Sequence, residues 1–276
     1  MIRPVLQDEA LLADVANASP DQVHIWWLGQ SGFLVRHGAT HFVFDPYLSD
    51  TLTEKYAATD KPHVRMTERV LDPAKLDFVS FATSTHAHTD HLDHGTLRPM
   101  REVNRDLKLV LPRAITAMAA ERLGDWGGNF LPMNAGEAME QVKGLRIEAV
   151  PAAHNELDRD GNGNHLYLGY VVTVGEKRIY HSGDTLLYPG MEEAIGTPVD
   201  VALLPINGNK PERRVSGNLD GREAAELARR LGAGVVVPCH YEMFEFNTAS
   251  PELFETTCRE LGQTCRVLRA GERLTI

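Results

Sequence analysis

The sequence has neither a basic stripe nor a long apolar run. Its 276 residues include 28 lysines and arginines against 38 aspartates and glutamates, which gives a formal net charge of −10. Proteins that grip nucleic acid usually present a concentrated basic surface, so we expect no nucleic-acid partner. No uninterrupted apolar segment approaches the roughly 18–20 residues that a membrane helix needs, so we expect no membrane partner.

Cysteine is also scarce. Cys239, Cys258 and Cys265 have no paired spacing, which argues against a disulfide framework and favours reduced thiols. Residues 1–14 carry acidic side chains within their apolar stretch and lack the basic start and apolar centre of a signal peptide. We therefore expect a cytoplasmic protein.

Strand and helix patterns alternate along the chain without a linker rich in glycine, serine or proline, so we expect one domain over residues 1–276. The predicted helices are 1–20, 112–123, 222–231 and 251–261. The predicted strands are 24–28, 33–35, 41–44, 78–82, 145–150, 168–174, 177–181, 201–205, 235–238 and 265–268. An early meander followed by βα alternation indicates two sheets packed face to face with helices outside.

Histidine and aspartate side chains follow four of these strands. Directly after the strand at 78–82 come His86, His88, Asp90 and His91. His154, Asp184 and His240 each follow a later strand, and connections at strand ends can converge on one edge of a sheet. An isolated histidine is usually structural or exposed, but three histidines and an aspartate within six residues predict a metal site.

The residue types indicate which ions would bind. Imidazole nitrogens and carboxylate oxygens suit zinc, manganese or iron. His86 and His88, two residues apart, can point the same way, while Asp90 and His91 can turn toward a second position. Asp184 can bridge two ions, and ions about 3.5–4 Å apart can hold a hydroxide that is reactive near neutral pH. We therefore expect two divalent ions, manganese or zinc, with iron as a further option.

The segment from Thr85 to His91 resembles the HxHxDH signature of the metallo-β-lactamase fold superfamily. The later order of His154, Gly183-Asp184-Thr185 and His240 is similar to the same pattern. The resemblance implies an α/β fold, a four-layer αββα sandwich of two mixed β-sheets with outer helices. It also implies ligands for a first metal (His86, His88, His154), ligands for a second (Asp90, His91, His240), a bridging Asp184 and a supporting Asp45.

Several stretches are similar to the L-ascorbate-6-phosphate lactonase (UlaG-like) family, which is manganese-dependent in its best-known members. They are Trp26-Trp27-Leu28-Gly29, Thr85 to Asp93, Tyr180 to Thr185, Asp200 to Leu203 and Ala233 to His240. This resemblance implies hydrolysis of an ester or lactone bond by a metal-bridging hydroxide. Asp90 and Asp184 would be the catalytic carboxylates.

Substrate contacts are harder to assign. The loop at 47–73 and the loop at 207–218 offer Tyr47, Lys61, Arg65, Asn207, Lys210, Arg213 and Arg214, and two residues near the expected ligands are His181 and Tyr241. Because arginine binds phosphate bidentately, a small anionic or phosphorylated substrate fits these loops. The alternative is that such charged side chains are only solvated.

Two other functions use the same residues. A two-metal phosphodiesterase acting on nucleotides or other phosphate esters would need the same pair of ions. A non-catalytic metal-binding module would keep the fold without the chemistry, although no ligand position is substituted here. The apolar, strand-rich N-terminal part also offers a surface for a homo-oligomer.

Overall fold

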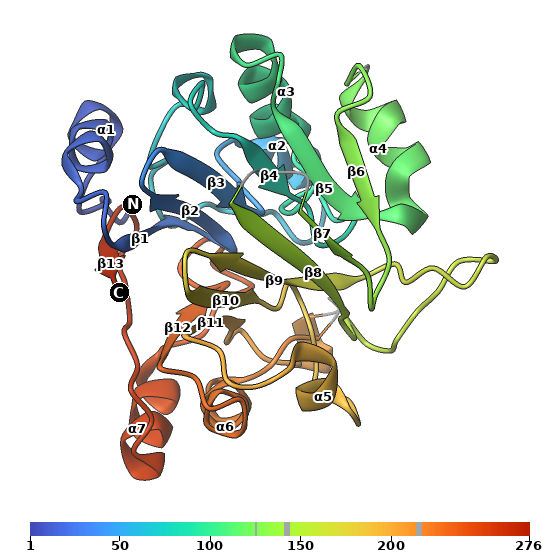
Figure 1. Ribbon diagram of the computed structural model, residues 1–276. Helices are drawn as coiled ribbons and strands as arrows, with labels where there is room; N and C mark the ends of the chain where they lie inside the picture. The colour runs from blue at the N-terminus through green and yellow to red at the C-terminus, as the bar shows by residue number, and fades with distance from the viewer. Residues whose placement is uncertain (125, 141–143, 214–216) are drawn as a thin grey trace.

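Two β-sheets pack face to face, with helices on both outer sides (Figure 1). The computed structural model describes residues 1–124, 126–140, 144–213 and 217–276. The predicted four-layer αββα sandwich is confirmed. None of the described helices is long and apolar enough to cross a membrane.

The first sheet has the strand order β13-β1-β2-β3-β4-β5-β6. Its strands are β1 (Val23–Gly29), β2 (Gly32–His37), β3 (Thr40–Phe44), β4 (Phe81–Thr83), β5 (Lys108–Pro112), β6 (Phe130–Met133) and β13 (Arg273–Thr275). Pairing is antiparallel from β13 to β3 and parallel from β3 to β6. The sheet is therefore mixed, as expected.

The second sheet has the order β12-β11-β10-β9-β8-β7. Its strands are β7 (Ala138–Met139), β8 (Leu145–Pro151), β9 (Leu168–Val174), β10 (Lys177–His181), β11 (Val201–Pro205) and β12 (Val235–Cys239). β10, β11 and β12 are parallel, whereas β7 to β10 pair antiparallel. The ends of β8, β10 and β12 carry the later candidate ligands.

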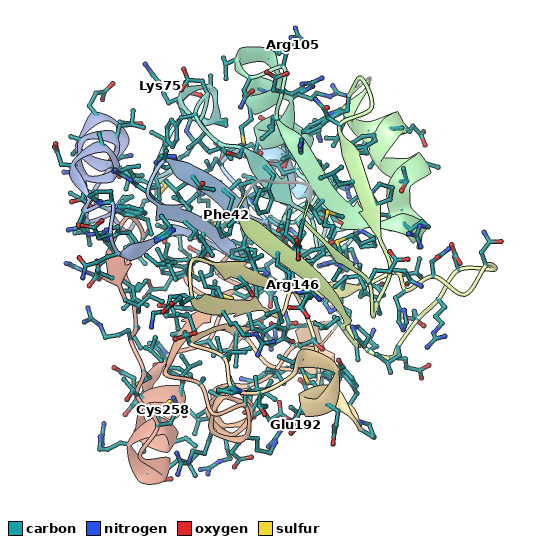
Figure 2. The ribbon with its side chains drawn as sticks, viewed as in Figure 1. Phe42, Lys75, Arg105, Arg146, Glu192 and Cys258 are labelled. Carbon is teal, nitrogen blue, oxygen red and sulfur yellow. The ribbon has the colours of Figure 1, made fainter. Side chains whose placement is uncertain are left out.

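Apolar side chains fill the space between the sheets and beneath the helices. Phe42, which lies between the two sheets in Figure 2, stacks on Phe81 with ring centroids 4.8 Å apart. Outside the first sheet pack α1 (Asp8–Asn17), α3 (His94–Val103) and α4 (Thr116–Leu123). Outside the second lie α5 (Met191–Ile195), α6 (Gly221–Arg230) and α7 (Glu252–Leu261). Burial of each such aromatic side chain contributes roughly 1.5–3 kcal/mol and keeps the strand ends in place.

The helix starts follow local chemistry. At α6, Asp220 accepts a hydrogen bond from the Glu223 amide at 2.9 Å, and the Glu223 carboxylate accepts one from the Asp220 amide at 2.9 Å. This capping box satisfies amides that the first helical turn leaves unpaired. Asp93 caps α3, a helix that the sequence pattern did not predict, by accepting from the Gly95 amide.

Several predicted boundaries were wrong. Pro112 does not begin a helix; it ends β5 in an extended conformation, and α4 starts at Thr116 after one 3-10 turn. The strand predicted at 265–268 is only a bridge between Cys265 and Val236, and the closing strand is β13. The strand predicted at 78–82 begins at Phe81. The loop at 47–73 contains the short helix α2 (Thr51–Tyr56).

Candidate metal centre

Residues from four strand ends meet at one place between the sheets. The segment from His86 to His91 follows β4, His154 follows β8, Asp184 follows β10, and His240 follows β12. Their side chains form three overlapping groups in which the potential ligand atoms lie within 4.8 Å of one another: His86, His88 and His154; His86, His91 and Asp184; Asp90, His91 and His240. All seven predicted ligands therefore lie together.

Asp184 lies between the two predicted metal positions. Its Oδ1 is 3.3 Å from Nε2 of His91. Its Oδ2 is 3.2 Å from Nε2 of His240 and 3.6 Å from Nε2 of His154. One carboxylate thus contacts rings from both predicted sets, which is the geometry that a bridging ligand needs.

Unpaired buried polar atoms indicate that this cluster suits a cation. His86, His91 and Asp184 are 1%, 0% and 4% exposed. Among the described residues, Nε2 of His86 has no hydrogen-bond partner, and Nε2 of His91 and Oδ1 of Asp184 have none beyond their mutual contact at 3.3 Å. Leaving such a buried group unpaired costs about 1–3 kcal/mol each. All three atoms could coordinate a divalent cation, so the residues present fit the expected metals.

In known metal sites a ligating histidine usually donates its other ring N–H to an oxygen, and two of the clustered histidines do so here. Nδ1 of His91 donates to Oδ2 of Asp45 at 2.7 Å. Nδ1 of His154 donates to the carbonyl oxygen of Gly217 at 3.0 Å. Both contacts leave Nε2 as the atom that faces the cluster.

The Asp45 carboxylate accepts several hydrogen bonds from the loop that carries the histidines. Besides His91, its carboxylate accepts from the Thr83 hydroxyl at 2.6 Å, from the Thr85 amide at 3.2 Å and from the Thr85 hydroxyl. Burial alone would raise the pKa of Asp45, but these hydrogen bonds, that of His91 first, hold it below its ordinary value. The predicted supporting position thus corresponds to a buried, ionised carboxylate.

Several residues around the cluster have strained backbone conformations. Gln30, Asp45 and His240 have φ angles of +49°, +33° and +61°, which side chains other than glycine rarely adopt. Such conformations cost about 1–3 kcal/mol each and persist where the surrounding structure enforces them. Next to Asp184, Gly183 has φ +60°, and a Cβ there would lie 2.7 Å from Cβ of Thr85. The turn that presents Asp184 therefore requires glycine.

Burial and neighbouring charges shift the pKa values of the clustered histidines in opposite directions. Burial lowers the pKa of His154 to about 4, so this ring is neutral at pH 7. Burial also disfavours a charge on His240, but the Asp184 carboxylate outweighs it and raises the pKa of His240 to about 9. At His91 burial is likewise outweighed by Asp184 and then Asp90, and its pKa lies well above the ordinary value. In the metal-free protein, His91 and His240 therefore carry protons that balance the two carboxylates.

We expect metal binding to release protons at pH 7. A histidine nitrogen must lose its proton before it coordinates, and the raised pKa of His240 (about 9) means that the proton is still present at that pH. The apparent metal affinity should fall as the pH falls, by up to about tenfold per pH unit for each proton displaced. Calorimetric titration of zinc into chelator-treated protein, in two buffers of different ionisation enthalpy, measures the release. Equal heats in both buffers would contradict it.

A cavity of about 490 Å³ opens beside the cluster. His88, Asp90, His154, Asp184 and His240 line it, together with Gln30, Asn207 and Asn218. Its aromatic lining comes from Tyr56, His63, Phe244 and Phe246, among which His63 stacks on Tyr56 with ring centroids 4.3 Å apart. The volume suits a small molecule with one polar and one apolar part.

Of the candidate substrate contacts, Asn207 lines this cavity, whereas His181, Tyr241, Arg65 and Arg213 do not. The His181 ring is buried against Phe44, and its Nε2 donates to the Ser31 carbonyl oxygen at 2.8 Å. Tyr241 stacks on Trp27. Both rings pack behind the metal centre and neither lines the cavity, so their contact with substrate stays a prediction.

The two arginines are also engaged elsewhere. Arg65 pairs with Asp50 at 2.7 Å and donates to the Ser49 carbonyl oxygen. Arg213 donates to Asn247 and to the backbone of Asn207 and Gly208. Their guanidinium groups stabilise loops and do not line the cavity, so their contact with substrate stays a prediction. Arg214 lies outside the described residues.

Replacing Tyr241 with phenylalanine should separate packing from catalysis. The variant loses the hydrogen bond from the Tyr241 hydroxyl to the Leu268 carbonyl oxygen (2.8 Å) and keeps the stacked ring. We expect the free energy of unfolding to fall by about 1 kcal/mol, with kcat/KM changed less than about twofold. Urea unfolding and steady-state kinetics test this. A large loss of kcat/KM in a stable variant would restore Tyr241 to the site.

Sequence reasoning missed Gln30. Its Nε2 donates to Oδ2 of Asp90 at 2.8 Å and lies 3.1 Å from Nε2 of His240. The only signal was its place in the turn Gly29-Gln30-Ser31-Gly32, between the first two strands. The 60 residues that separate it from Asp90 gave no reason to connect the two.

Comparison with known proteins gives the family. A family model for the Beta-lactamase superfamily domain matches residues 40–241. A UPF0173 metal-dependent hydrolase of Thermus thermophilus is 31% identical over 254 residues, covering 92% of this chain and 99% of the relative. One of Pyrococcus abyssi is 31% identical over 261 residues, covering 92% of this chain and 100% of the relative.

Solved structures share the architecture. The metallo hydrolase Igni18 of Ignicoccus hospitalis superposes with a TM-score of 0.67 at 26% identity, covering 92% of this chain and 98% of that one. An isothiocyanate hydrolase from Delia radicum gut bacteria has a TM-score of 0.70 at 20% identity, over 91% and 98% of the two chains, and so shares the fold alone. The chain therefore belongs to the β-lactamase superfamily and, within it, to the UPF0173 metal-dependent hydrolases.

Proposed function

We propose that this metal-dependent hydrolase cleaves an ester or lactone bond in a small molecule with two divalent ions. One observation carries the proposal: the seven donor side chains form overlapping groups, and Asp184 contacts histidines of both proposed ligand sets. His86, His88 and His154 would hold one ion, Asp90, His91 and His240 the other, and Asp184 both. This is the donor set of manganese, zinc or iron rather than of softer metals.

The bound ions would supply an activated water near neutral pH and polarise the bond to be broken. The chain's own groups orient the reactants. Asp90 lines the cavity, and the hydrogen bond from Gln30 fixes its Oδ2. Asp90 is therefore placed to accept the proton that the attacking water loses and to deliver it to the leaving group.

The pKa of Asp90 is consistent with an ionised acceptor. Burial would raise it, but the charges of His91 and His240, with a hydrogen bond from the latter, hold it below its ordinary value. The carboxylate is thus ionised at pH 7, the form that both metal binding and proton acceptance require. Asp45 does not line the cavity; it orients His91 and holds the loop that carries Thr83 and Thr85.

The test is a substrate screen with metal analysis. Chelator-treated protein is reloaded with manganese, zinc or iron, its metal content is measured, and each form is assayed with aliphatic lactones, aryl esters and bis-p-nitrophenyl phosphate. We expect turnover of lactones or esters that depends on the added metal. Preferential cleavage of the phosphodiester would favour a two-metal phosphodiesterase. Tight metal binding without turnover of any member would favour a non-catalytic module.

A further inference from the structure

Two nearly buried asparagines line the cavity beside the metal centre. Asn207, just past β11, is 2% exposed, and Asn218 is 1% exposed. The backbone of Asn207 pairs with that of Asp220, which brings the two segments together. The residue before Asn218 is Gly217, whose carbonyl oxygen accepts from His154. Asn218 is therefore held next to a proposed metal ligand.

Polar atoms of both asparagines have no partner. Within the described ranges, Oδ1 of Asn207 and both Oδ1 and Nδ2 of Asn218 form no hydrogen bond. Native proteins leave few buried polar groups unsatisfied, and each costs about 1–3 kcal/mol. Three such atoms on two neighbouring segments, in residues that line a cavity, indicate a binding function.

The orientation of the Asn207 carboxamide follows from a chain of hydrogen bonds. Nη1 of Arg213 is 2.8 Å from Oδ1 of Asn247, and Nδ2 of Asn207 is 3.0 Å from the same oxygen. A guanidinium can only donate, so the atom of Asn247 that it contacts is the oxygen. Asn207 must then turn its amino group to Asn247, which leaves its own oxygen free. The free atom of Asn207 is thus an acceptor that requires a donor.

Charge near the cavity does not favour a phosphate at this position. Among the described residues that line the cavity outside the metal cluster, the cationic side chains are Lys55 and Arg122. Nη1 of Arg122 already donates to the carbonyl oxygens of Ala87 (2.6 Å) and Leu92 (3.3 Å). A phosphomonoester dianion presents only acceptors, so its oxygens would face the Asn207 oxygen without a hydrogen bond.

We infer that Asn207 and Asn218 form a subsite for a neutral substrate group that carries an N–H or O–H donor, such as a secondary amide, a lactam or a hydroxyl. The inference rests on the proposed hydrolysis only in taking this group as part of the substrate. The donor satisfies the Asn207 oxygen, and the acceptor of the same group, such as an amide or lactam carbonyl, satisfies Nδ2 of Asn218. Arg213 acts as a positioning residue through Asn247.

Ligand binding to the metal-free protein tests the subsite without turnover. The probes are 2-pyrrolidinone, its N-methyl derivative, which lacks the N–H, and methyl phosphate, whose dianion has no donor. Dissociation constants come from chemical-shift changes in NMR titrations. We expect 2-pyrrolidinone to bind at least about tenfold more tightly than the N-methyl compound, because the latter leaves the Asn207 oxygen unpaired. Equal affinities, or tighter binding of methyl phosphate, would overturn the inference.

Matched variants locate the effect. Asn207→Leu and Asn218→Leu should each reduce the preference for the N–H compound to within about twofold, whereas Asn162→Leu, on the exposed segment at 161–163, should retain it. A preference that survives both cavity variants would place the binding elsewhere and refute the assignment. The wild-type ratio decides the question even when a variant does not fold.

A second arm uses the metal-loaded enzyme and separates this inference from the proposed function. Esters with one scissile bond and a remote primary amide, N,N-dimethylamide or phosphate are compared by kcat/KM. We expect the primary amide to exceed the other two by at least about tenfold, and Asn218→Leu to remove that advantage. Hydrolysis of all three at equal rates would refute the subsite and leave the hydrolase intact. Absence of hydrolysis together with a wild-type binding preference would refute the hydrolase and leave the subsite intact.

Discussion

Asp184→Asn should lower the bound metal from two ions to one or fewer and reduce kcat/KM by on the order of 10²–10³ or more. The substitution keeps the shape of the side chain and removes its charge. It therefore removes the charge of the carboxylate that contacts His91, His154 and His240. Metal content by elemental analysis and kcat/KM with the best ester or lactone are measured on the same samples.

The matched control for this variant is Asp106→Asn, which makes the same chemical change in an exposed turn. It should retain both metal and activity. The metal-free protein offers a further readout, because Asp184 is the group that raises the pKa of His240 to about 9. In Asp184→Asn that pKa should fall, which NMR titration of the His240 ring detects. Two bound ions and unchanged turnover in the variant would remove Asp184 from the bridging position.

Asp45→Asn should weaken both the fold and the metal centre, although Asp45 does not line the cavity. Its two oxygens accept from His91, Thr83 and Thr85, and an amide would turn an N–H toward some of these donors. We expect the free energy of unfolding of the metal-free protein to fall by roughly 3–5 kcal/mol, as for other broken buried pairs. Metal affinity should fall about 10–100-fold because His91 loses the group that orients it.

Urea unfolding of chelator-treated protein and a metal-binding titration provide the two numbers. Asp21→Asn, at an exposed position before β1, serves as the control. If Asp45→Asn lost metal affinity at unchanged stability, Asp45 would be acting on the ion rather than through His91. If both values matched the wild type, the hydrogen bonds that Asp45 accepts would contribute neither to stability nor to metal affinity.

The ligand set was the most predictable part of the site. His86, His88, Asp90 and His91 occur close together in the sequence, so their joint chemistry was visible without a fold. His154, Asp184 and His240 were found because each follows an apolar strand that the periodicity identified. The helix predicted from Pro112 failed because proline suits a strand end as well as a first helical turn, and only pairing with β6 decides between them.

The cavity lining was the least predictable part. Arg65 and Arg213 were chosen for the affinity of guanidinium for phosphate, yet both are committed to loop contacts. Asn218 was overlooked because a single asparagine in a glycine-containing loop looks like turn chemistry. Its unpaired amide becomes informative only when its neighbours are known.

The sequence by itself determined the donor types, their order along the chain and the strand ends that carry them, because these depend on local composition and periodicity. The tertiary structure decided which groups touch. Gln30 reaches His240 across 210 positions, and Asn207 is oriented by Asn247 across 40. Hydrogen bonds and charges act over a few ångströms in space, whatever the separation along the chain. Only the packed sheets therefore reveal that Asp184 contacts both sets of ligands. Only they show that asparagine amides, rather than free arginines, line the adjoining cavity.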